Sequence, residues 1–556
     1  APTYHVSVKR HLLHFVLLCS AIALLAGCVK GHVDRPALGA AREPGDHSQW
    51  GRASRRNNVV TDLSNTRTTP LTWDIGTFDE DTGDWQPGTG KHIKWVARLG
   101  SNSFGNPVVA GGKVYVGTNN DRGYLERFPA GKVDLGVLLC FDELTGRFLW
   151  QYSSEKLEGG DRHDFAGIGI CSSPYVEGDR VWLVTNRCEV VCLDANGFRD
   201  GENDGDVQDE AVIAPDEADV IWRYDMRGKL GVQPLFMSNC SVTASHKWLM
   251  VSTSNAADER GEHVPAPNAP SFIILDKSVG TLLWQDNSPG DRIVHGSWSS
   301  PVLLLRGLRV GAIFPGGDGW LYAFAFHAEE LLIDRAPDPH GLAFLSTQEQ
   351  FEARLLWRFD CNLPGTEWKP GGRGDRNSII ATPVVTQDGR VIVATGQNPE
   401  FGTGPGVLWC IQPRSREAVA SWRYTGTDLN NDGKLAFDET FHRSISSVVV
   451  KDDLVIAVDL SGIVHCLDLN TGKPYWTHDT LAGCWGSPLI VGDRVYLGTD
   501  SGHVFVFALA KEKTLLAQND MGESVYSTPI VANGVLYIAT KTRLFAITSA
   551  IGRRPQ

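Results

Sequence analysis

Pairs of short apolar segments separated by a polar turn recur along the chain. The stretch SPYVEGDRVWLVTN at residues 173–186 has apolar runs on both sides of Glu-Gly-Asp-Arg, and SPLIVGDRVYLGTD repeats the pattern at 487–500. Short apolar runs bounded by Gly and Asp are typical of strands joined by a tight turn. Eight such pairs begin near the following residues: Pro107, Pro174, Val242, Pro301, Pro383, Val448, Pro488 and Pro529.

A second motif follows three of these pairs at a fixed spacing. The stretches FDELTGRFLW, LDKSVGTLLW and LDLNTGKPYW each place a Gly four residues and a Trp eight residues after an Asp. Gly permits a tight turn between two further strands, and Trp adds a large apolar surface to the outer one. The three copies are Asp142, Gly146 and Trp150; Asp276, Gly280 and Trp284; and Asp468, Gly472 and Trp476. Looser copies end at Trp222, Trp357 and Trp422.

The eighth repeat, at residues 527–547, ends before its fourth strand. The stretch KHIKWVARL around Trp95 supplies an unpaired strand at the other end of the chain. Four-stranded repeats of about 40–70 residues that close in a circle predict a β-propeller. We therefore predict an all-β fold, an eight-bladed β-propeller at residues 89–549 that is closed by an N-terminal strand, with a tail at 550–556. Residues 326–356, within the fourth repeat, predict short helices in an insertion.

The repeat resembles the pyrroloquinoline-quinone (PQQ) repeat of quinoprotein-type propellers. Phrases such as GICSSP, FPGGDGWLYAF and VYSTP resemble a planctomycete-type subfamily of exported PQQ-like propellers. Members of that subfamily are likened to the lipoprotein that assists β-barrel assembly in the outer membrane. The resemblance implies either a scaffold that binds cell-envelope proteins through its faces, as a monomer, or an enzyme that uses PQQ.

The net charge excludes one class of partner, and the positions of the cysteines indicate their role in the fold. The chain has 556 residues and a formal net charge of −13, which argues against nonspecific binding of nucleic acid. Nine cysteines follow Cys28. When the repeats are aligned, one column of the third strand contains Cys140, Cys192, Ile274, Ala323, Cys410, Cys466, Val506 and Ala546. Because Cys alternates there with Ala, Val and Ile, we expect these four thiols to be small buried apolar groups.

The N-terminus has the features of an export signal. Lys9 and Arg10 precede an apolar run that ends in Leu-Ala-Gly-Cys28, which resembles a bacterial lipobox. That resemblance implies a lipoprotein signal peptide at residues 1–27 and lipid on the Cys28 sulfur. An ordinary signal peptide or a signal anchor is the alternative. We expect a polar tether or N-terminal extension at residues 28–88 and a protein held at the outer membrane or in the periplasm.

Residues 428–439, DLNNDGKLAFDE, have the spacing of a calcium loop. Oxygen ligands fall at positions 1, 3, 5 and 12, and Gly433 stands at the sharp turn. The predicted ligands are the side chains of Asp428, Asn430, Asp432 and Glu439 and the main-chain carbonyl of Lys434. Residues 199–210 offer a weaker match through Asp200, Glu202 and Asp204, because position 12 is Ala211. The alternative for both loops is a solvated acidic turn.

Polar and aromatic residues also recur just before the predicted innermost strands. A ring of Arg, His and Trp at the mouth of a channel is a way to hold an anionic aromatic ligand such as PQQ. The candidates for such a site are Arg376, His442, Arg443, Trp298 and Trp485. The alternative is that the Asp/Arg pairs are salt bridges between blades and that the two Trp fill the core.

Two functions therefore remain after the sequence analysis. We favour a lipid-anchored envelope scaffold with a structural calcium loop. The alternative is a PQQ- and calcium-dependent dehydrogenase that oxidises an alcohol or sugar. Its relatives that oxidise alcohols carry an adjacent Cys-Cys pair, which this sequence lacks.

Overall fold

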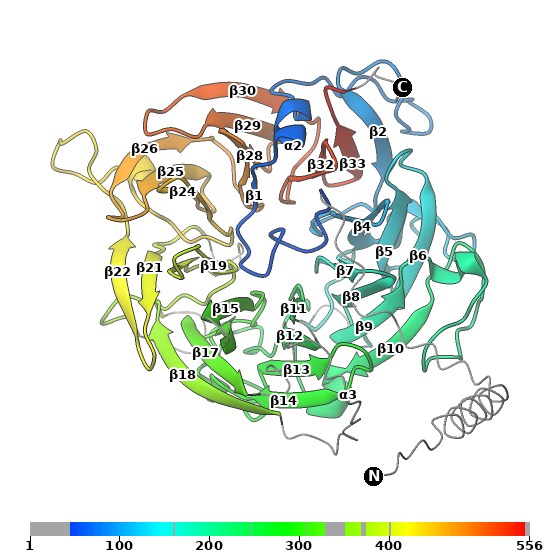
Figure 1. Cartoon of the computed structure of the whole chain (residues 1–556), viewed down its shortest axis with the longest axis horizontal. Helices are drawn as coiled ribbons and strands as arrows, with labels where there is room; N and C mark the ends of the chain where they lie inside the picture. The colour runs from blue at the N-terminus through cyan, green and yellow to red at the C-terminus, as the bar shows by residue number, and fades with distance from the viewer. Residues whose placement is uncertain are drawn as a thin grey trace, which may run out of the picture. The chain divides into compact units, whose positions relative to one another are not determined.

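The computed structural model describes residues 45–158, 162–245, 247–306, 309–327, 351–367, 374–397, 399 and 402–550. These residues belong to one compact unit, residues 42–556. The unit is an eight-bladed β-propeller whose blades surround a central channel (Figure 1). The predicted fold is therefore confirmed. Cys28 and the predicted signal peptide lie outside the described residues.

Each blade has four antiparallel strands, and β1 (Val59–Val60) adds a fifth, parallel strand to the sheet of blade 7. Blades 1 to 4 contain β3 (Val108–Ala110), β4 (Lys113–Asn119), β5 (Leu135–Asp142) and β6 (Phe148–Glu155); β7 (Tyr175–Glu177), β8 (Arg180–Val184), β9 (Glu189–Asp194) and β10 (Val220–Asp225); β11 (Thr243–Ser245), β12 (Trp248–Ser252), β13 (Phe272–Asp276) and β14 (Leu282–Asp286); and β15 (Val302–Arg306), β16 (Arg309–Pro315), β17 (Trp320–His327) and β18 (Glu352–Asp360). The first strand of each set is innermost.

Blades 5 to 8 repeat this order, and blade 8 takes its outer strand from the N-terminal part of the chain. They contain β19 (Val384–Val385), β20 (Val391–Ala394), β21 (Leu408–Pro413) and β22 (Ala418–Tyr424); β23 (Val449–Lys451), β24 (Leu454–Val458), β25 (Ile463–Asp468) and β26 (Pro474–Asp479); β27 (Leu489–Val491), β28 (Arg494–Gly498), β29 (His503–Ala508) and β30 (Leu515–Asp520); and β31 (Ile530–Ala532), β32 (Val535–Ala539), β33 (Arg543–Ile547) and β2 (Ile93–Arg98).

The N-terminal strand closes the ring as predicted. β2 pairs antiparallel with β33, and Trp95 lies opposite Ala546. The same position pairs Trp150 with Cys140 in blade 1. A small residue on the third strand therefore faces the Trp of the fourth strand. The described cysteines, nine in number, are all buried and free, which confirms that the four Cys of this column serve as apolar core residues.

The repeated Gly and Trp join neighbouring blades. The Trp422 indole of blade 5 donates to the carbonyl of Leu469 in blade 6, at 2.8 Å. Gly472 lies three residues after Leu469 and has φ +69°. A Cβ at this position would lie 2.5 Å from the Trp422 ring. Gly146 and Trp95 repeat this contact between blades 1 and 8. The spacing found in the sequence is thus a docking device between blades.

The prediction of helices near residues 326–356 is wrong where the structure describes them. β17 continues to His327 and β18 begins at Glu352, and the two strands pair from end to end. β18 is an outer strand on which exposed and half-buried residues are mixed. Such a strand lacks a clean two-residue alternation, so its charged residues mimic a helical face. Residues 328–350 lie outside the described part.

Helices are few and short among the described residues. They include α2 (Leu63–Thr68), α3 (Met226–Leu230) and the 3₁₀ turns η1 (Asn120–Arg122), η3 (Gly197–Asp200), η4 (Gly290–Arg292) and η8 (Phe437–Glu439). In the described part of the chain, no helix is long and apolar enough to cross a membrane.

Candidate functional site

Residues 47–60, here called the channel segment, cross the centre of the ring of blades in Figure 1 and bond to the innermost strands around one end of the central channel. The backbones of His47 and Val109 exchange two hydrogen bonds, of 2.9 and 3.0 Å. The segment makes further bonds to innermost strands through these pairs: Ser48 with Val176, Ser54 with Leu303, Arg55 with Val385, Asn57 with Val450, and Asn58 with Ile490. At its end β1 (Val59–Val60) pairs parallel with β27. These bonds satisfy edge groups that the innermost strands would otherwise leave unpaired.

Arg56 extends these contacts to blade 3. Its side chain is fully buried, and its guanidinium donates to the carbonyls of Trp50 at 2.7 Å and Val242 at 2.9 Å. Longer bonds reach the carbonyls of Ser241 and Pro301. Burial lowers the pKa of Arg56 to about 10. Asn58 donates to the carbonyl of Pro529 in blade 8, so the channel segment bonds to every blade.

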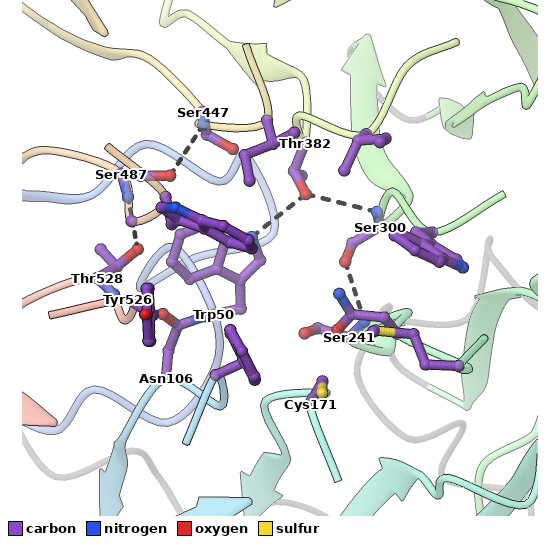
Figure 2. Close-up of a pocket in the computed structure, with 18 of the residues that line it drawn as sticks. Trp50, Asn106, Cys171, Ser241, Ser300, Thr382, Ser447, Ser487, Tyr526 and Thr528 are labelled. Atoms are coloured by element: carbon purple, nitrogen blue, oxygen red, sulfur yellow. Dashed lines mark hydrogen bonds between the residues drawn. The ribbon is translucent and has the colours of Figure 1, made fainter. Parts of the chain in front are cut away.

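A ring of small polar residues lies next to the channel segment. Each precedes the innermost strand of its blade, and we call the set the polar ring: Asn106, Ser173, Ser241, Ser300, Thr382, Ser447, Ser487 and Thr528. The backbone N–H of one member donates to the side-chain oxygen of the next, as between Ser447 and Ser487 at 2.8 Å and between Ser487 and Thr528 at 2.8 Å (Figure 2). Equivalent bonds link Thr528 to Asn106, Ser173 to Ser241, Ser241 to Ser300, and Ser300 to Thr382.

Two further contacts involve members of the polar ring. Asn106 donates through its side-chain amide to Ser173 at 3.1 Å. Between Thr382 and Ser447 the described chain shows no such bond. There the Trp50 indole, from the channel segment, donates to Thr382 at 3.4 Å (Figure 2). The channel segment and the polar ring together form the floor of a cavity.

The cavity has a volume of about 280 Å³ and is lined by side chains from all eight blades. A continuous aromatic wall is formed by three residues, each two positions before a member of the polar ring in the chain: Phe104, Trp485 and Tyr526. The Phe104 and Tyr526 rings are stacked with centroids 5.1 Å apart, and those of Trp485 and Tyr526 are 5.2 Å apart. Trp298, Phe165 and Phe236 also line the cavity.

The cavity opens on the face where the outer strand of one blade connects to the innermost strand of the next. We call this the link face, and the opposite side the plugged face. Alternation of strand direction within a four-stranded blade places the first and third turns on the plugged face and the middle turn on the link face. Because residues 428–439 connect β22 to β23, they lie on the link face.

The described residues that line the cavity include no Asp, Glu, Lys, Arg or His. The one thiol among them is Cys171, and burial raises its pKa to about 12. At neutral pH this thiol is protonated, so it is a poor nucleophile. The described lining is therefore suited to binding by shape, aromatic contact and neutral hydrogen bonds.

The structure brings together two of the five residues predicted to hold PQQ. Trp298 and Trp485 line the cavity. Arg376 is outside the lining and pairs with Asp360 at 2.8 Å. Arg443 is also outside it and donates to Asn377 at 2.8 Å. Binding of PQQ by this set stays a prediction.

His442, the fifth residue, belongs to a buried network in blade 6. Its Nδ1 lies 2.9 Å from Oδ2 of Asp459, and Nε2 of His465 lies 3.4 Å from the same oxygen. Burial raises the pKa of the Asp459 carboxyl, but hydrogen bonds from both His outweigh it and hold the pKa at about 2. The network connects β24 and β25 to the end of the predicted calcium loop.

The predicted calcium loop is closed by its own backbone. Glu439 is buried, and its carboxylate accepts from the N–H groups of Leu429 at 2.9 Å and Ala436 at 3.1 Å. Asp428 accepts from the N–H of Gly433 at 2.9 Å. Across the described residues, no group of three or more His, Cys, Asp or Glu side chains is arranged to hold a metal ion. Calcium binding by residues 428–439 stays a prediction.

The weaker acidic loop joins β9 to β10, so it lies on the plugged face. Asp200 accepts from the Glu202 N–H at 3.1 Å, and Asp204 lies 3.5 Å from Arg180. These contacts are those of a solvated turn anchored to its blade. Calcium binding by this loop also stays a prediction.

Sequence reasoning missed most of the cavity. Phe104 and Tyr526 stand three residues before Pro107 and Pro529, at the same offset that singled out Trp298 and Trp485. Applying that offset to every repeat would have found them. Trp50 gave no such signal, because it lies outside the repeats.

Comparison with known proteins agrees with this architecture. Residues 349–555 match the family model described as outer membrane protein assembly factor BamB. No curated protein matches the chain in sequence.

Solved structures are similar to the chain at low sequence identity. A europium-containing methanol dehydrogenase is 11% identical, with a TM-score of 0.54 and coverage of 90% of each chain. The quinohemoprotein alcohol dehydrogenase ADHIIG from Pseudomonas putida HK5 is 11% identical, with a TM-score of 0.51; the match covers 92% of this chain and 81% of that one. BamB from Moraxella catarrhalis is 14% identical, with a TM-score of 0.43 and coverage of 77% and 94%.

Proposed function

Since the chain is a β-propeller of the PQQ-like family, we propose that it is an exported scaffold that binds cell-envelope proteins on its link face. In this proposal the lipid on Cys28 anchors the propeller to the membrane. The match of residues 349–555 to an outer membrane assembly factor supports a role in the assembly of outer-membrane proteins.

Exposed apolar side chains on the link face are the observation that carries this proposal. Phe437 is 58% exposed on the connection between blades 5 and 6, and Leu481 is 88% exposed on the connection between blades 6 and 7. η8 packs against β26, so the two connections are neighbours. Large apolar side chains held in water next to one another are typical of surfaces that bind a partner.

The alternative enzyme is less well supported by the cavity. PQQ carries carboxylates, and burying them without cations costs several kcal/mol on the order-of-magnitude scale for desolvated ions. The described lining offers aromatic rings and hydroxyl groups, while Arg376 and Arg443 bond elsewhere. These residues do not fit an anionic quinone, so we derive no catalytic step for it.

Site-specific photocrosslinking tests the proposed surface. A photoreactive amino acid placed at Phe437 or Leu481 is expected to form discrete adducts with envelope proteins in intact cells, because these side chains would lie in the interface. Leu144 is the matched control, since it is 72% exposed but lies in the third turn of blade 1, on the plugged face. Equal adducts from Leu144, or none from the link face, would contradict the proposal.

A further inference from the structure

The floor of the cavity offers hydrogen-bond donors that its own structure does not use. Ser241, Ser300, Ser487 and Thr528 each accept an N–H from a neighbouring blade through the side-chain oxygen. A hydroxyl has one donor in addition to its acceptor sites. The Ser300 hydroxyl shares a hydrogen bond with the Cys240 thiol. Among the described residues, the hydroxyls of Ser241, Ser487 and Thr528 donate no hydrogen bond. All four residues line the cavity, so the O–H groups of Ser241, Ser487 and Thr528 are available to a ligand.

The walls select for an apolar, planar body. Phe104, Trp485 and Tyr526 form one continuous aromatic surface, and Trp298 with Phe165 and Phe236 supplies other parts of the lining. Aromatic rings pack well on such surfaces, in stacked or edge-to-face arrangements. A volume of about 280 Å³ accommodates one small ring system.

The absence of charge from the described lining decides the polarity of the ligand. A carboxylate or ammonium group would lose its hydration there and gain no ion pair, which is unfavourable. A neutral oxygen would instead accept from the free hydroxyl groups of the floor. The channel segment closes the far end, so the ligand enters and leaves by the link face.

We propose that this cavity is a binding site for an uncharged aromatic compound that carries a hydrogen-bond acceptor oxygen, such as an aryl ketone. The ring lies against the aromatic wall, and the oxygen points to the polar ring.

Three probes of nearly the same shape separate the contributions of the aromatic ring, the neutral oxygen and the charge to binding. Acetophenone has the ring and the neutral oxygen, benzoate replaces the methyl ketone by a carboxylate, and α-methylstyrene replaces the oxygen by a methylene group. Titration of the full chain, followed by tryptophan fluorescence and calorimetry, is expected to show saturable 1:1 binding of acetophenone. Benzoate is expected to bind at least about 100-fold more weakly. α-Methylstyrene is expected to bind roughly 3–10-fold more weakly, the loss of a neutral hydrogen bond.

A variant that fills the cavity with a larger side chain tests whether the ligand binds there. Ile380 lines it and is partly exposed, so Ile380→Trp is expected to abolish acetophenone binding while the thermal midpoint stays unchanged. Leu144→Trp is the matched control, because it adds the same side chain at an exposed position on the plugged face, outside the lining. Ile445→Trp fills the cavity from blade 6 and replaces the first variant if that protein does not fold.

Three results would overturn the inference. One is the lack of saturable acetophenone binding by the folded chain. Another is benzoate binding as tight as that of acetophenone. The third is unchanged acetophenone binding in a folded filling variant.

Discussion

Replacing Arg56 with Met is expected to lower the free energy of unfolding by about 3 kcal/mol. The buried guanidinium donates to main-chain carbonyls of Trp50, Ser241, Val242 and Pro301. Met fills much of the same volume but leaves the Trp50 and Val242 carbonyls buried without a donor, at a cost of about 1–3 kcal/mol each. The Pro301 carbonyl keeps its hydrogen bond from the Thr243 hydroxyl. Removing a buried charge offsets part of this loss, since burial already lowers the pKa of Arg56. The cost of the unpaired carbonyls exceeds the gain from removing one buried charge, so the net effect is destabilising.

Arg52 is the matched control for this experiment. It lies in the same segment and shares a positive φ, 65° against 61° for Arg56. Its contacts are weaker, a 3.4 Å bond to the Val531 carbonyl and a 3.7 Å ion pair with Asp62. Arg52→Met is expected to cost less than about 1 kcal/mol. Urea unfolding followed by tryptophan fluorescence measures both variants, and equal losses would show that the channel segment does not hold the blades through Arg56.

Replacing Gly472 with Val is expected to cost about 3 kcal/mol, for two reasons. A residue other than Gly at φ +69° costs about 1–2 kcal/mol. The new Cβ would also lie 2.5 Å from the Trp422 ring, and overpacking of a buried contact costs about 1–3 kcal/mol. The docking of blade 5 on blade 6 would therefore loosen.

Gly389→Val separates the two contributions. Gly389 has φ +85°, but a Cβ there would meet no atom within 4 Å. This control is expected to lose only the conformational part, about 1–2 kcal/mol. If thermal and urea unfolding give the same loss for both variants, the Gly–Trp contact contributes nothing to docking of the blades.

The fold was accessible from the sequence because its repeats carry a physical spacing. Asp, Gly and Trp recur at fixed offsets since each blade needs the same turn and the same docking contact. The fourth strand of the eighth blade was located by counting the strands of each repeat, and Trp95 opposite Ala546 fills the place that Trp150 fills opposite Cys140. Periodicity failed at β18, where an outer strand mixes exposed and half-buried residues.

The cavity was only partly accessible, because its walls depend on contacts between distant segments. Trp298 and Trp485 were found by their offset, but nothing local shows that Trp50 reaches Thr382 across 332 residues. The Arg and His candidates were chosen for their charge and for their place just before a predicted innermost strand. In the structure Arg376 has Asp360 as its partner, and His442 has Asp459. The position of a charged residue just before an innermost strand thus does not show whether its side chain lines the cavity or pairs with a neighbouring residue.

Calorimetric titration of the purified chain with PQQ in the presence of calcium tests the central claim most directly. A cavity whose described lining carries no charged side chain, closed by the channel segment, predicts no saturable binding of this anionic quinone at concentrations up to about 100 μM, a Kd well above those of resident cofactors. Stoichiometric binding of PQQ, with the absorbance of the bound quinone, would contradict the account and favour the dehydrogenase.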